Sequence, residues 1–251
     1  AAEARRAAAE ARAGASNSGG HRDVLQVSVT EVIDASRFYV HVLGEGVAQL
    51  ESLMAELNAE STIHAPNPAF SQSVKRNDKA ICKFTDGQWY RVQVERVSDD
   101  KTEAEIRYID YGNTEFIGVE YLLPLPPQFA QLRPQAVEAS LAFFWYVSAV
   151  AVSLLLDNLH LTYLTFVARS YYLLLQVPTA DDDYGTDAAQ YFRDLVWDKT
   201  LAATVEYREG EKLFVVLEDT QNNQRVNVLL VHEGLALFDR RAYGHNPELV
   251  C

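Results

Sequence analysis

The chain has 251 residues, of which 48% are apolar and 23% are charged, a balance that is typical of globular proteins and excludes wholesale disorder. The 35 acidic residues outnumber the 22 basic ones, and the formal charge of −13 argues against broad nucleic-acid binding through phosphate contacts and favours a cationic partner. Cys82 and Cys251 are the only cysteines, too few for a disulfide framework or a zinc cluster. We expect a fragment of a longer intracellular protein, because the chain begins with Ala1 and its last residues complete no predicted element.

The first third of the chain predicts a linker, two strands and a helix. Residues 1–13 are rich in alanine and carry no apolar stripe, which is typical of a solvated helix, and a flexible Ser- and Gly-rich stretch follows. β-Branched residues predict strands at 24–33 and 36–43. Apolar residues at three- and four-residue steps predict an amphipathic helix at 46–60, and the Pro- and Ser-rich residues 61–77 predict a loop or boundary.

The next segment predicts a compact β unit. Its four expected strands are 80–84, 89–97, 104–109 and 113–117. The pair Asp86-Gly87 between the first two strands is a hairpin signal. Four strands with tight turns in so short a stretch predict a small barrel.

The second half of the chain predicts further strands and a helix. The expected elements are strands at 137–143, 201–207 and 212–217, a helix at 187–197, a turn at 221–224 that leads into Val226–Leu230, and a short helical or looped connection from 231.

An aromatic cluster marks the β unit. Phe84 and Tyr90 flank its first hairpin, so both rings can lie at one mouth of the barrel. Tyr108 and Tyr111 have opposite parity on a straight strand, but Gly112 can adopt a positive φ and turn the chain so that the two rings meet. Four aromatic walls around one opening predict a site for a methylated cation, which keeps its charge but is weakly hydrated. The alternative is that these rings are simply the core of the barrel.

Two segments carry a family resemblance. Residues 83–91, KFTDGQWYR, and residues 108–113, YIDYGN, resemble the two signature segments of Tudor domains. Their flanks, from about 24 to 143 and from 177 to 240, are similar to the Tudor staphylococcal nuclease family. The resemblance implies a mainly β fold with helices (α+β), in which an SH3-like Tudor barrel is inserted in a split staphylococcal-nuclease-like OB-fold.

The resemblance also implies domain boundaries. The expected parts are a linker helix and flexible segment at 1–23, the first part of the OB-fold at 24–70, the Tudor barrel at 71–123 and the second part of the OB-fold at 124–251. The chain stops before the terminal helix that covers the OB barrel in the family, so we expect a truncated C-terminus.

A peptide-binding site follows from the same resemblance. The aromatic cage of the family maps onto Phe84, Tyr90, Tyr108 and Tyr111, and Asn113 matches the position that hydrogen-bonds the guanidinium. Arg91 and Asp110 are expected to pair, either as support of the cage or, as we favour, as a purely structural pair. The ligand implied is a peptide with symmetrically dimethylated arginine, and no cofactor is implied.

The implied function is that of a methylarginine reader, which scaffolds RNA-processing or RNA-silencing complexes in the cytoplasm and the nucleus. Its expected partners are Arg/Gly-rich tails, such as those of Piwi/Argonaute or Sm-type proteins, with weak RNA contact and no membrane. The alternative is a part of a nuclease that acts on RNA, with the OB surface on the nucleic acid.

Catalysis is not expected from this segment. The wider family resembles a calcium-dependent nuclease, whose activity is expected in other repeats. The dense acidic run at 181–183 lies in a polar loop without an accompanying arginine pair, and the six histidines show no metal-ligand spacing. We therefore expect no metal site and no catalytic residue here.

An apolar block at 144–176 has no counterpart in the family. The uncharged residues 139–156 reach the lower length limit of a transmembrane helix, but such a helix would split the OB-fold between two strands. A buried insertion would need an apolar partner surface that the module lacks. The third interpretation, which we favour, is translated non-coding sequence such as a retained intron. If the block is real, its exposed patch predicts aggregation or a partner.

Overall fold

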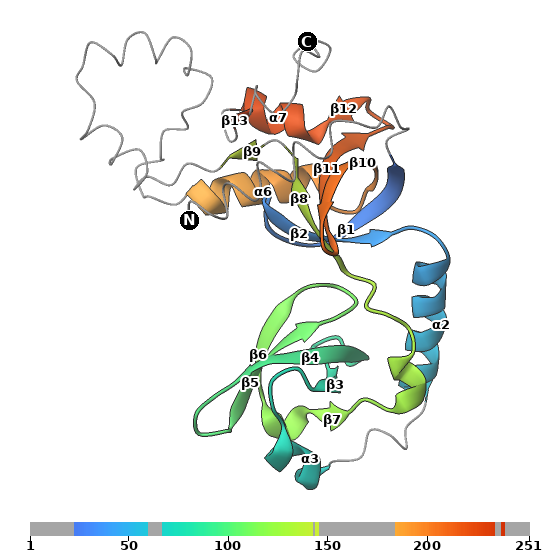
Figure 1. Ribbon diagram of the computed structural model, residues 1–251, viewed down its shortest axis with the longest axis vertical. Coiled ribbons are helices and arrows are strands. Elements are labelled where there is room, and N and C mark those ends of the chain that lie inside the picture. Colours follow the sequence, from blue (N-terminus) through green and yellow to red (C-terminus); the bar gives the residue numbers. More distant parts are fainter. Residues whose placement is uncertain (1–22, 60–66, 143, 146–183, 234–236, 239–251) are drawn as a thin grey trace, which may run out of the picture. The chain divides into compact units, whose positions relative to one another are not determined.

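The computed structural model describes residues 23–59, 67–142, 144–145, 184–233 and 237–238 (Figure 1). The predicted linker helix at 1–13, the acidic run at 181–183 and almost all of the apolar block lie outside these residues. The chain divides into two compact units, of which one comprises residues 26–31 and 38–138 and the other the remaining described residues. Each unit is described by itself below.

The first unit contains the predicted barrel, with one strand more than expected. Its strands are β3 (Lys79–Lys83), β4 (Trp89–Val97), β5 (Glu103–Tyr108), β6 (Thr114–Gly118) and β7 (Leu123–Pro124). They pair in the antiparallel order β6-β5-β4-β3-β7. The two-residue strand β7 was not predicted, and it adds Leu123 and Pro124 to the edge of β3.

Alternation along the strands builds the core of this barrel. On β5, Ala104, Ile106 and Tyr108 are buried, whereas the intervening residues are more exposed, as the two-residue period of a strand requires. Val92 and Val94 of β4 join the same core cluster. Val92 and Val94 therefore mark the buried face of β4.

Helix α2 (Glu45–Ala59) packs on the other side of β3. Its predicted bounds were 46–60. Leu57 belongs to a second apolar cluster with Ile81 and Phe129. Asn58 fixes the helix to the start of β4, because its Oδ1 accepts from the backbone N of Trp89 at 2.7 Å and its Nδ2 donates to the Trp89 carbonyl at 3.1 Å.

The prediction of a loop or boundary at 61–77 missed one element. Residues Pro68–Ser73 form the short helix α3. The Oδ1 of Asn67 accepts from the backbone N of Phe70 at 3.0 Å, and Pro68 occupies the first turn. Asn as an N-cap followed by Pro is a regular helix start, so the signal was present in the sequence. Two further short helical turns, η2 (Val119–Tyr121) and η3 (Pro127–Ala130), lie on either side of β7.

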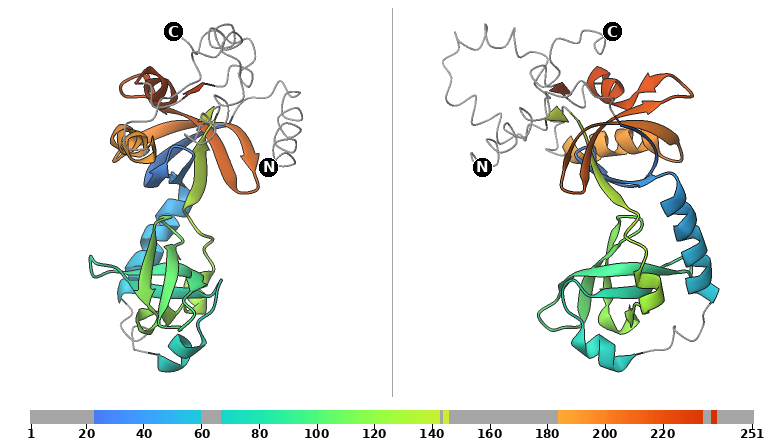
Figure 2. Two further views of the ribbon diagram at one scale, coloured as in Figure 1. Left: turned by 90° about the vertical axis from the view of Figure 1, so that its left-hand side faces the viewer. Right: turned by 45° about the vertical axis from the view of Figure 1, so that its right-hand side comes forward.

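The second sheet combines strands from both ends of the chain. Its elements are β1 (Val24–Asp34), β2 (Arg37–Val42), β8 (Val137–Leu141), β10 (Thr200–Glu209), β11 (Lys212–Asp219) and β12 (Gln224–Arg225). The order is β10-β1-β2-β8-β11-β12, and an additional pairing of β10 with β11 closes the first five strands into a ring. Figure 2 shows β10 and β11 as one long bent hairpin in orange. A closed five-stranded barrel agrees with the expected OB-type part.

Two helices, α6 (Tyr184–Val196) and α7 (Val226–His232), belong to the same part of the fold. Helix α7 contacts β11, β12 and α6. Within α6, Ala188, Phe192 and Val196 are buried at helical spacing. The turn expected at 221–224 is present, but Val226–Leu230 belongs to α7, so helix begins five residues before the expected position at 231. A last pair of two-residue strands, β9 (Phe144–Trp145) and β13 (Leu237–Phe238), runs antiparallel. No helix among the described residues is long and apolar enough to cross a membrane.

Candidate functional site

The four predicted aromatic residues come together in the structure. The ring centroid of Tyr90 lies 5.4 Å from that of Tyr111, 5.9 Å from that of Tyr108 and 6.0 Å from that of Phe84. Phe84 and Tyr108 are 5.4 Å apart. All four pairs meet at 81–85°, which is the edge-to-face arrangement that ring quadrupoles prefer.

The hairpin between β3 and β4 positions the first two rings. Gly87 has a φ of +85° and donates its N–H to the carbonyl of Phe84 at 3.0 Å. The carboxylate of Asp86 accepts from the backbone N of Gln88 at 2.8 Å. The turn is therefore the Asp-Gly hairpin that the sequence predicted, and it places Phe84 and Tyr90 on the same side of the barrel wall.

The turn after β5 positions Tyr111. The carbonyl of Tyr108 accepts from the backbone N of Tyr111 at 3.2 Å and from that of Gly112 at 2.8 Å, so the chain turns directly after Tyr108. Gly112 has a φ of +97°, and a Cβ added there would stand 2.2 Å from the ring of Tyr39. The prediction of a positive φ at Gly112 is confirmed, and the close Tyr39 ring is a second reason for glycine that the sequence did not reveal.

Side chains of β1 and β2 contact the backbone of the turn after β5. Thr30 Oγ1 donates to the carbonyl of Tyr111 at 2.7 Å. The Nε2 of His41 lies 2.6 Å from the carbonyl of Asp110, and the His41 ring is 5.5 Å from that of Tyr111. These contacts join residues far apart in the sequence, so sequence reasoning did not find them.

Arg91 and Asp110 pair as predicted. Arg91 is 1% exposed and its guanidinium binds both carboxylate oxygens of Asp110, at 2.8 and 2.6 Å. Its Nη1 also donates to the carbonyls of Phe129 and Leu132, at 2.9 and 2.6 Å. Asp110 in turn accepts from the backbone N of Gln135 at 3.1 Å. The pair therefore ties β4, the turn that carries Tyr111 and the segment after η3 into one network.

Two of the aromatic residues donate their hydroxyls to carboxylates. Tyr90 donates to Asp86 Oδ2 at 2.7 Å, and Tyr108 donates to Glu115 Oε2 at 2.8 Å. Burial and these acceptors raise the pKa of both phenols above the ordinary value, and the Tyr90 bond lowers the pKa of Asp86. At neutral pH the rings are therefore uncharged and the Asp86 carboxylate is ionised.

The five residues predicted to bind methylarginine differ in solvent exposure. Phe84, Tyr90, Tyr111 and Asn113 are half-buried, whereas Tyr108 is only 1% exposed. The backbone carbonyl of Asn113 accepts from the N of Tyr108 at 2.9 Å. Tyr108 thus closes the inner side of the cluster, while the rings of Phe84, Tyr90 and Tyr111 reach the surface.

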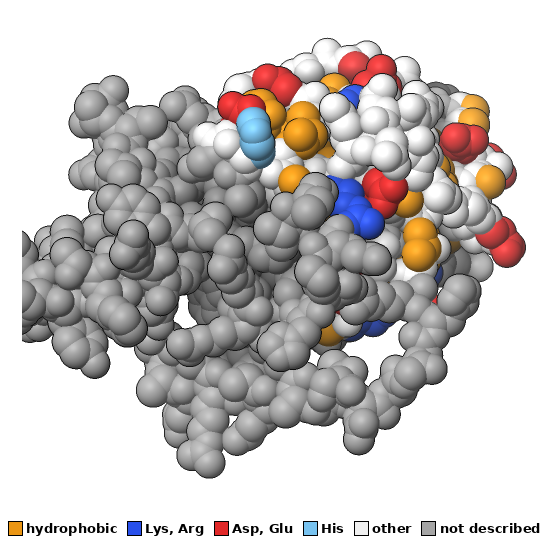
Figure 3. Space-filling view, turned by 90° about the horizontal axis from the view of Figure 1, so that it is seen from above, with side chains coloured by type: hydrophobic (Ala, Val, Ile, Leu, Met, Phe, Trp, Pro, Cys, Tyr) orange, Lys and Arg blue, Asp and Glu red, His pale blue; other side chains and the backbone are white. Residues whose placement is uncertain are grey.

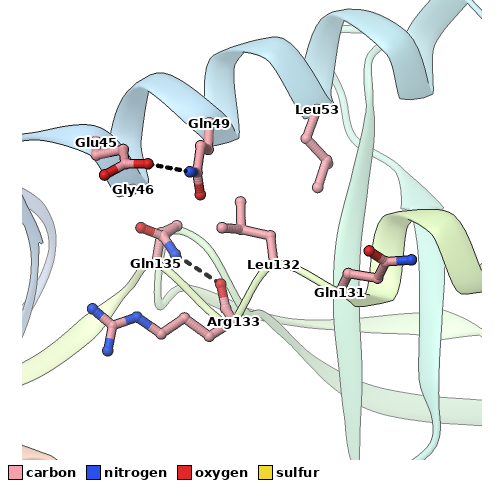
Figure 4. Close-up of a pocket in the computed structure, with 8 residues that line it drawn as sticks. All are labelled: Glu45, Gly46, Gln49, Leu53, Gln131, Leu132, Arg133 and Gln135. Atoms are coloured by element: carbon pink, nitrogen blue, oxygen red, sulfur yellow. Dashed lines mark hydrogen bonds between the residues drawn. The ribbon is translucent and has the colours of Figure 1, made fainter.

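A separate hollow of about 660 Å³ lies between α2 and the segment 131–135 (Figure 4). Its walls carry polar side chains, among them Gln49, which donates to Glu45 at 2.8 Å, and Gln135, which donates to the Arg133 carbonyl at 2.8 Å. It offers neither an aromatic wall nor a group of acidic, His or Cys ligands: no such group of three or more is found anywhere among the described residues. The aromatic cluster is the better candidate site.

The charge around the candidate site is negative. Residues 78–123 hold ten acidic and six basic residues. Such an excess of acidic residues attracts cations and repels phosphates. Figure 3 shows a different face, seen from above the view of Figure 1 on the side of α7 and β12, and acidic side chains appear at several places of the described surface there.

The chain is similar to several known proteins. A family model described as Tudor domain matches residues 22–143. Staphylococcal nuclease domain-containing protein 1 of Drosophila melanogaster is 31% identical over 226 residues, which cover 89% of this chain and 20% of the relative. Ribonuclease TUDOR 2 of Arabidopsis thaliana is 25% identical over 242 residues, 88% of this chain and 21% of the relative. The chain thus spans about a fifth of the length of these relatives.

Solved structures match both units of the chain. The extended Tudor domain of Drosophila melanogaster Tudor-SN is 29% identical, covers 92% of this chain and 91% of its own, and superposes with a TM-score of 0.69. The extended Tudor domain TD3 of mouse TDRD1, solved with a MILI peptide containing dimethylarginine, is 20% identical, covers 88% and 96%, and has a TM-score of 0.66. The described residues therefore have the fold of an extended Tudor domain.

Proposed function

Because a Tudor domain model matches residues 22–143 and the chain is homologous to Staphylococcal nuclease domain-containing protein 1, we propose that it binds peptides carrying symmetrically dimethylated arginine. The observation that carries the proposal is the group of four rings whose neighbours meet nearly at right angles. Extended Tudor domains of the same fold have been solved with a dimethylarginine peptide, for mouse TDRD1, and with sDMA, for BmPAPI. These neighbours support the choice of ligand.

The chemistry of the ligand fits the walls of the site. Methylation keeps the guanidinium charge but weakens its hydration, so aromatic faces compete well with water. Each desolvated cation–π contact contributes about 2 kcal/mol, so two or three of them give roughly 4–6 kcal/mol before ordering costs. That corresponds to a Kd between about 1 mM and tens of micromolar. Flanking arginines and the acidic surface would add to it.

Asn113 is the proposed polar contact. It follows the turn that carries Tyr111 and is half-buried. Its side-chain carbonyl can accept from a guanidinium N–H without a charge that would favour lysine equally. We assign the ligand to Phe84, Tyr90, Tyr108, Tyr111 and Asn113, with Arg91 and Asp110 as their structural support.

Isothermal titration tests the proposal. The ligands are three versions of one Arg/Gly-rich peptide, with symmetrically dimethylated, asymmetrically dimethylated and unmodified arginine. The symmetric form is expected to bind most tightly, and Asn113→Ala is expected to weaken it without lowering thermal stability. Equal affinity for the three peptides contradicts the assignment.

The cellular role follows from the ligand. We propose that the protein scaffolds RNA-processing or RNA-silencing complexes by holding the methylated tails of Piwi/Argonaute or Sm-type proteins, in the cytoplasm and the nucleus. Capture of such tails from cells should disappear when arginine methylation is inhibited. Capture that is independent of methylation would contradict this role.

A Tudor domain is a binding module, and we propose that this segment has no nuclease activity of its own. The printed names of the relatives point to nuclease activity in longer proteins. Incubation of this chain with RNA and Ca²⁺ is expected to give no cleavage above a chelator control. Robust turnover would favour the alternative of a nuclease part whose OB surface contacts RNA.

A further inference from the structure

Two carboxylates accept hydrogen bonds from tyrosine hydroxyls of the aromatic site. The Tyr90 hydroxyl donates to Asp86 Oδ2 at 2.7 Å, and the Tyr108 hydroxyl donates to Glu115 Oε2 at 2.8 Å. Asp86 lies in the β3–β4 hairpin and Glu115 on β6, so the two carboxylates come from separate elements. The same donor–acceptor arrangement thus occurs twice within one cluster of rings.

We propose that Asp86 and Glu115 are specificity-determining residues, which polarise the Tyr90 and Tyr108 rings so that the site selects a delocalised cation over a neutral ligand of the same shape. The inference rests on the proposed function and names the origin of its charge selectivity. Neither residue needs to touch the ligand, because each acts through a phenol.

The polarisation follows from the direction of the hydrogen bonds. A phenol that donates to a carboxylate shifts electron density toward its oxygen and ring, and hydrogen-bonded groups polarise one another in this way. A more negative ring face attracts a cation more strongly and leaves the contact with a neutral group almost unchanged. The negative charge of each carboxylate adds a direct attraction, which salt screens more at exposed Asp86 than at half-buried Glu115.

Asp86 also stabilises the β3–β4 hairpin, and the substitution used in the test must keep that contact. Its Oδ1 accepts from the backbone N of Gln88 at 2.8 Å, which holds the hairpin. Asp86→Asn can keep this bond through its one oxygen, while its amide nitrogen then faces the Tyr90 hydroxyl as a donor. The substitution therefore retains the geometry and reverses the polarity of the contact.

The experiment compares two ligands that differ in charge and hardly in shape. One peptide carries ω-methylarginine, and its partner carries ω-methylcitrulline, in which an oxygen replaces one terminal nitrogen. We expect Asp86→Asn and Glu115→Gln each to weaken the methylarginine peptide by about threefold to tenfold. Binding of the methylcitrulline peptide is expected to change by less than about twofold, since the neutral ligand feels little of the ring charge.

A control variant accounts for the change in net charge. Glu103→Gln removes the same charge from an exposed position of β5, and it is expected to leave both affinities unchanged. Equal weakening of both peptides by Asp86→Asn would mean that the carboxylate only positions the ring. Wild-type affinities in both carboxylate variants would also overturn the inference.

A double-mutant cycle decides whether the effect passes through the phenol. In a Tyr90→Phe background the hydroxyl is absent and only the direct attraction of the carboxylate remains, so Asp86→Asn is expected to weaken methylarginine binding less than it does in the wild type. Full additivity of the two substitutions contradicts the inference. Equal binding of methylated and unmodified arginine by the wild type would instead refute the proposed function, so the two failures are distinguishable.

Discussion

Arg91 and Asp110 form a buried bidentate ion pair, with 2.8 Å between Nε and Oδ2 and 2.6 Å between Nη2 and Oδ1. Each residue is 1% exposed. Asp110 lies directly before Tyr111 in the turn after β5, so the pair fixes the backbone from which that ring projects. The pair also binds backbone groups of η3 and of the segment that follows it, which are Phe129, Leu132 and Gln135.

Removing one member of this pair should destabilise the barrel strongly. Arg91→Met leaves the Asp110 carboxylate buried without its cation, which costs about 3–5 kcal/mol. The control is Arg96→Met, because Arg96 is 68% exposed in its pair with Glu105 and such a pair contributes at most about 1 kcal/mol. Urea unfolding measures both. Similar losses in the two variants would contradict a structural role for the buried pair.

Gly112 should tolerate no side chain. An alanine there would combine a φ of +97° with a Cβ 2.2 Å from the Tyr39 ring, which we expect to cost roughly 2–5 kcal/mol and to displace Tyr111. Gly210→Ala is the matched control, since its φ is +60° and nothing lies within 4 Å of the added Cβ. Thermal unfolding and peptide titration compare the two. The positive φ is unfavourable in both variants, but only Gly112→Ala adds the clash with Tyr39, so the larger loss of stability and the loss of binding are expected at Gly112. Equal behaviour of the two variants contradicts the steric argument.

The local parts of this site were predictable from the sequence. The Asp-Gly hairpin and the glycine after Tyr111 are short-range signals, because each specifies the backbone of the turn in which it lies. They were enough to predict that the rings of Phe84, Tyr90 and Tyr111 meet, and the ring distances agree.

The parts that were missed depend on distant residues or on very short elements. Strand β7 has two residues and therefore shows no periodicity. The bonds from Thr30 to Tyr111 and from Arg91 to Leu132 join residues 81 and 41 positions apart. Helix α3 was missed for a different reason. The cap residue Asn67 and the following Pro68 are a helix-start signal, but the Pro- and Ser-rich composition of the surrounding residues favoured a loop.

The pH dependence of stability should reflect Cys82. Burial raises the pKa of its thiol from 9.0 to about 11, so between these values the folded state holds a proton that the unfolded state has lost. Stability from this group is complete below pH 9 and falls as the pH rises toward 11. Urea unfolding across this range, compared with Cys82→Ala, checks the sign. An increase of stability toward pH 11 that depends on Cys82 would contradict it.

Tyr111 is the best position for testing the site by substitution. Tyr108 is 1% exposed and donates to Glu115, so Tyr108→Ala would open a cavity and cost about 3–5 kcal/mol, which confounds a binding result. Tyr111→Leu removes an outer wall, and we expect it to weaken the dimethylarginine peptide about tenfold or more. Tyr111→Phe keeps the ring and should bind like the wild type. Unchanged affinity in Tyr111→Leu would exclude this wall from the site.

The most direct test places the methyl groups of the ligand in the site. A peptide with ¹³C-methyl-labelled symmetric dimethylarginine is added to the protein, and nuclear Overhauser effects from these methyl groups are recorded. We predict an upfield ring-current shift of the methyl signal and contacts to the ring protons of Tyr90 and Tyr111, whose centroids lie 5.4 Å apart. Binding with methyl contacts to Leu53 or Leu132 in the hollow beside α2, and none to these rings, would contradict the account.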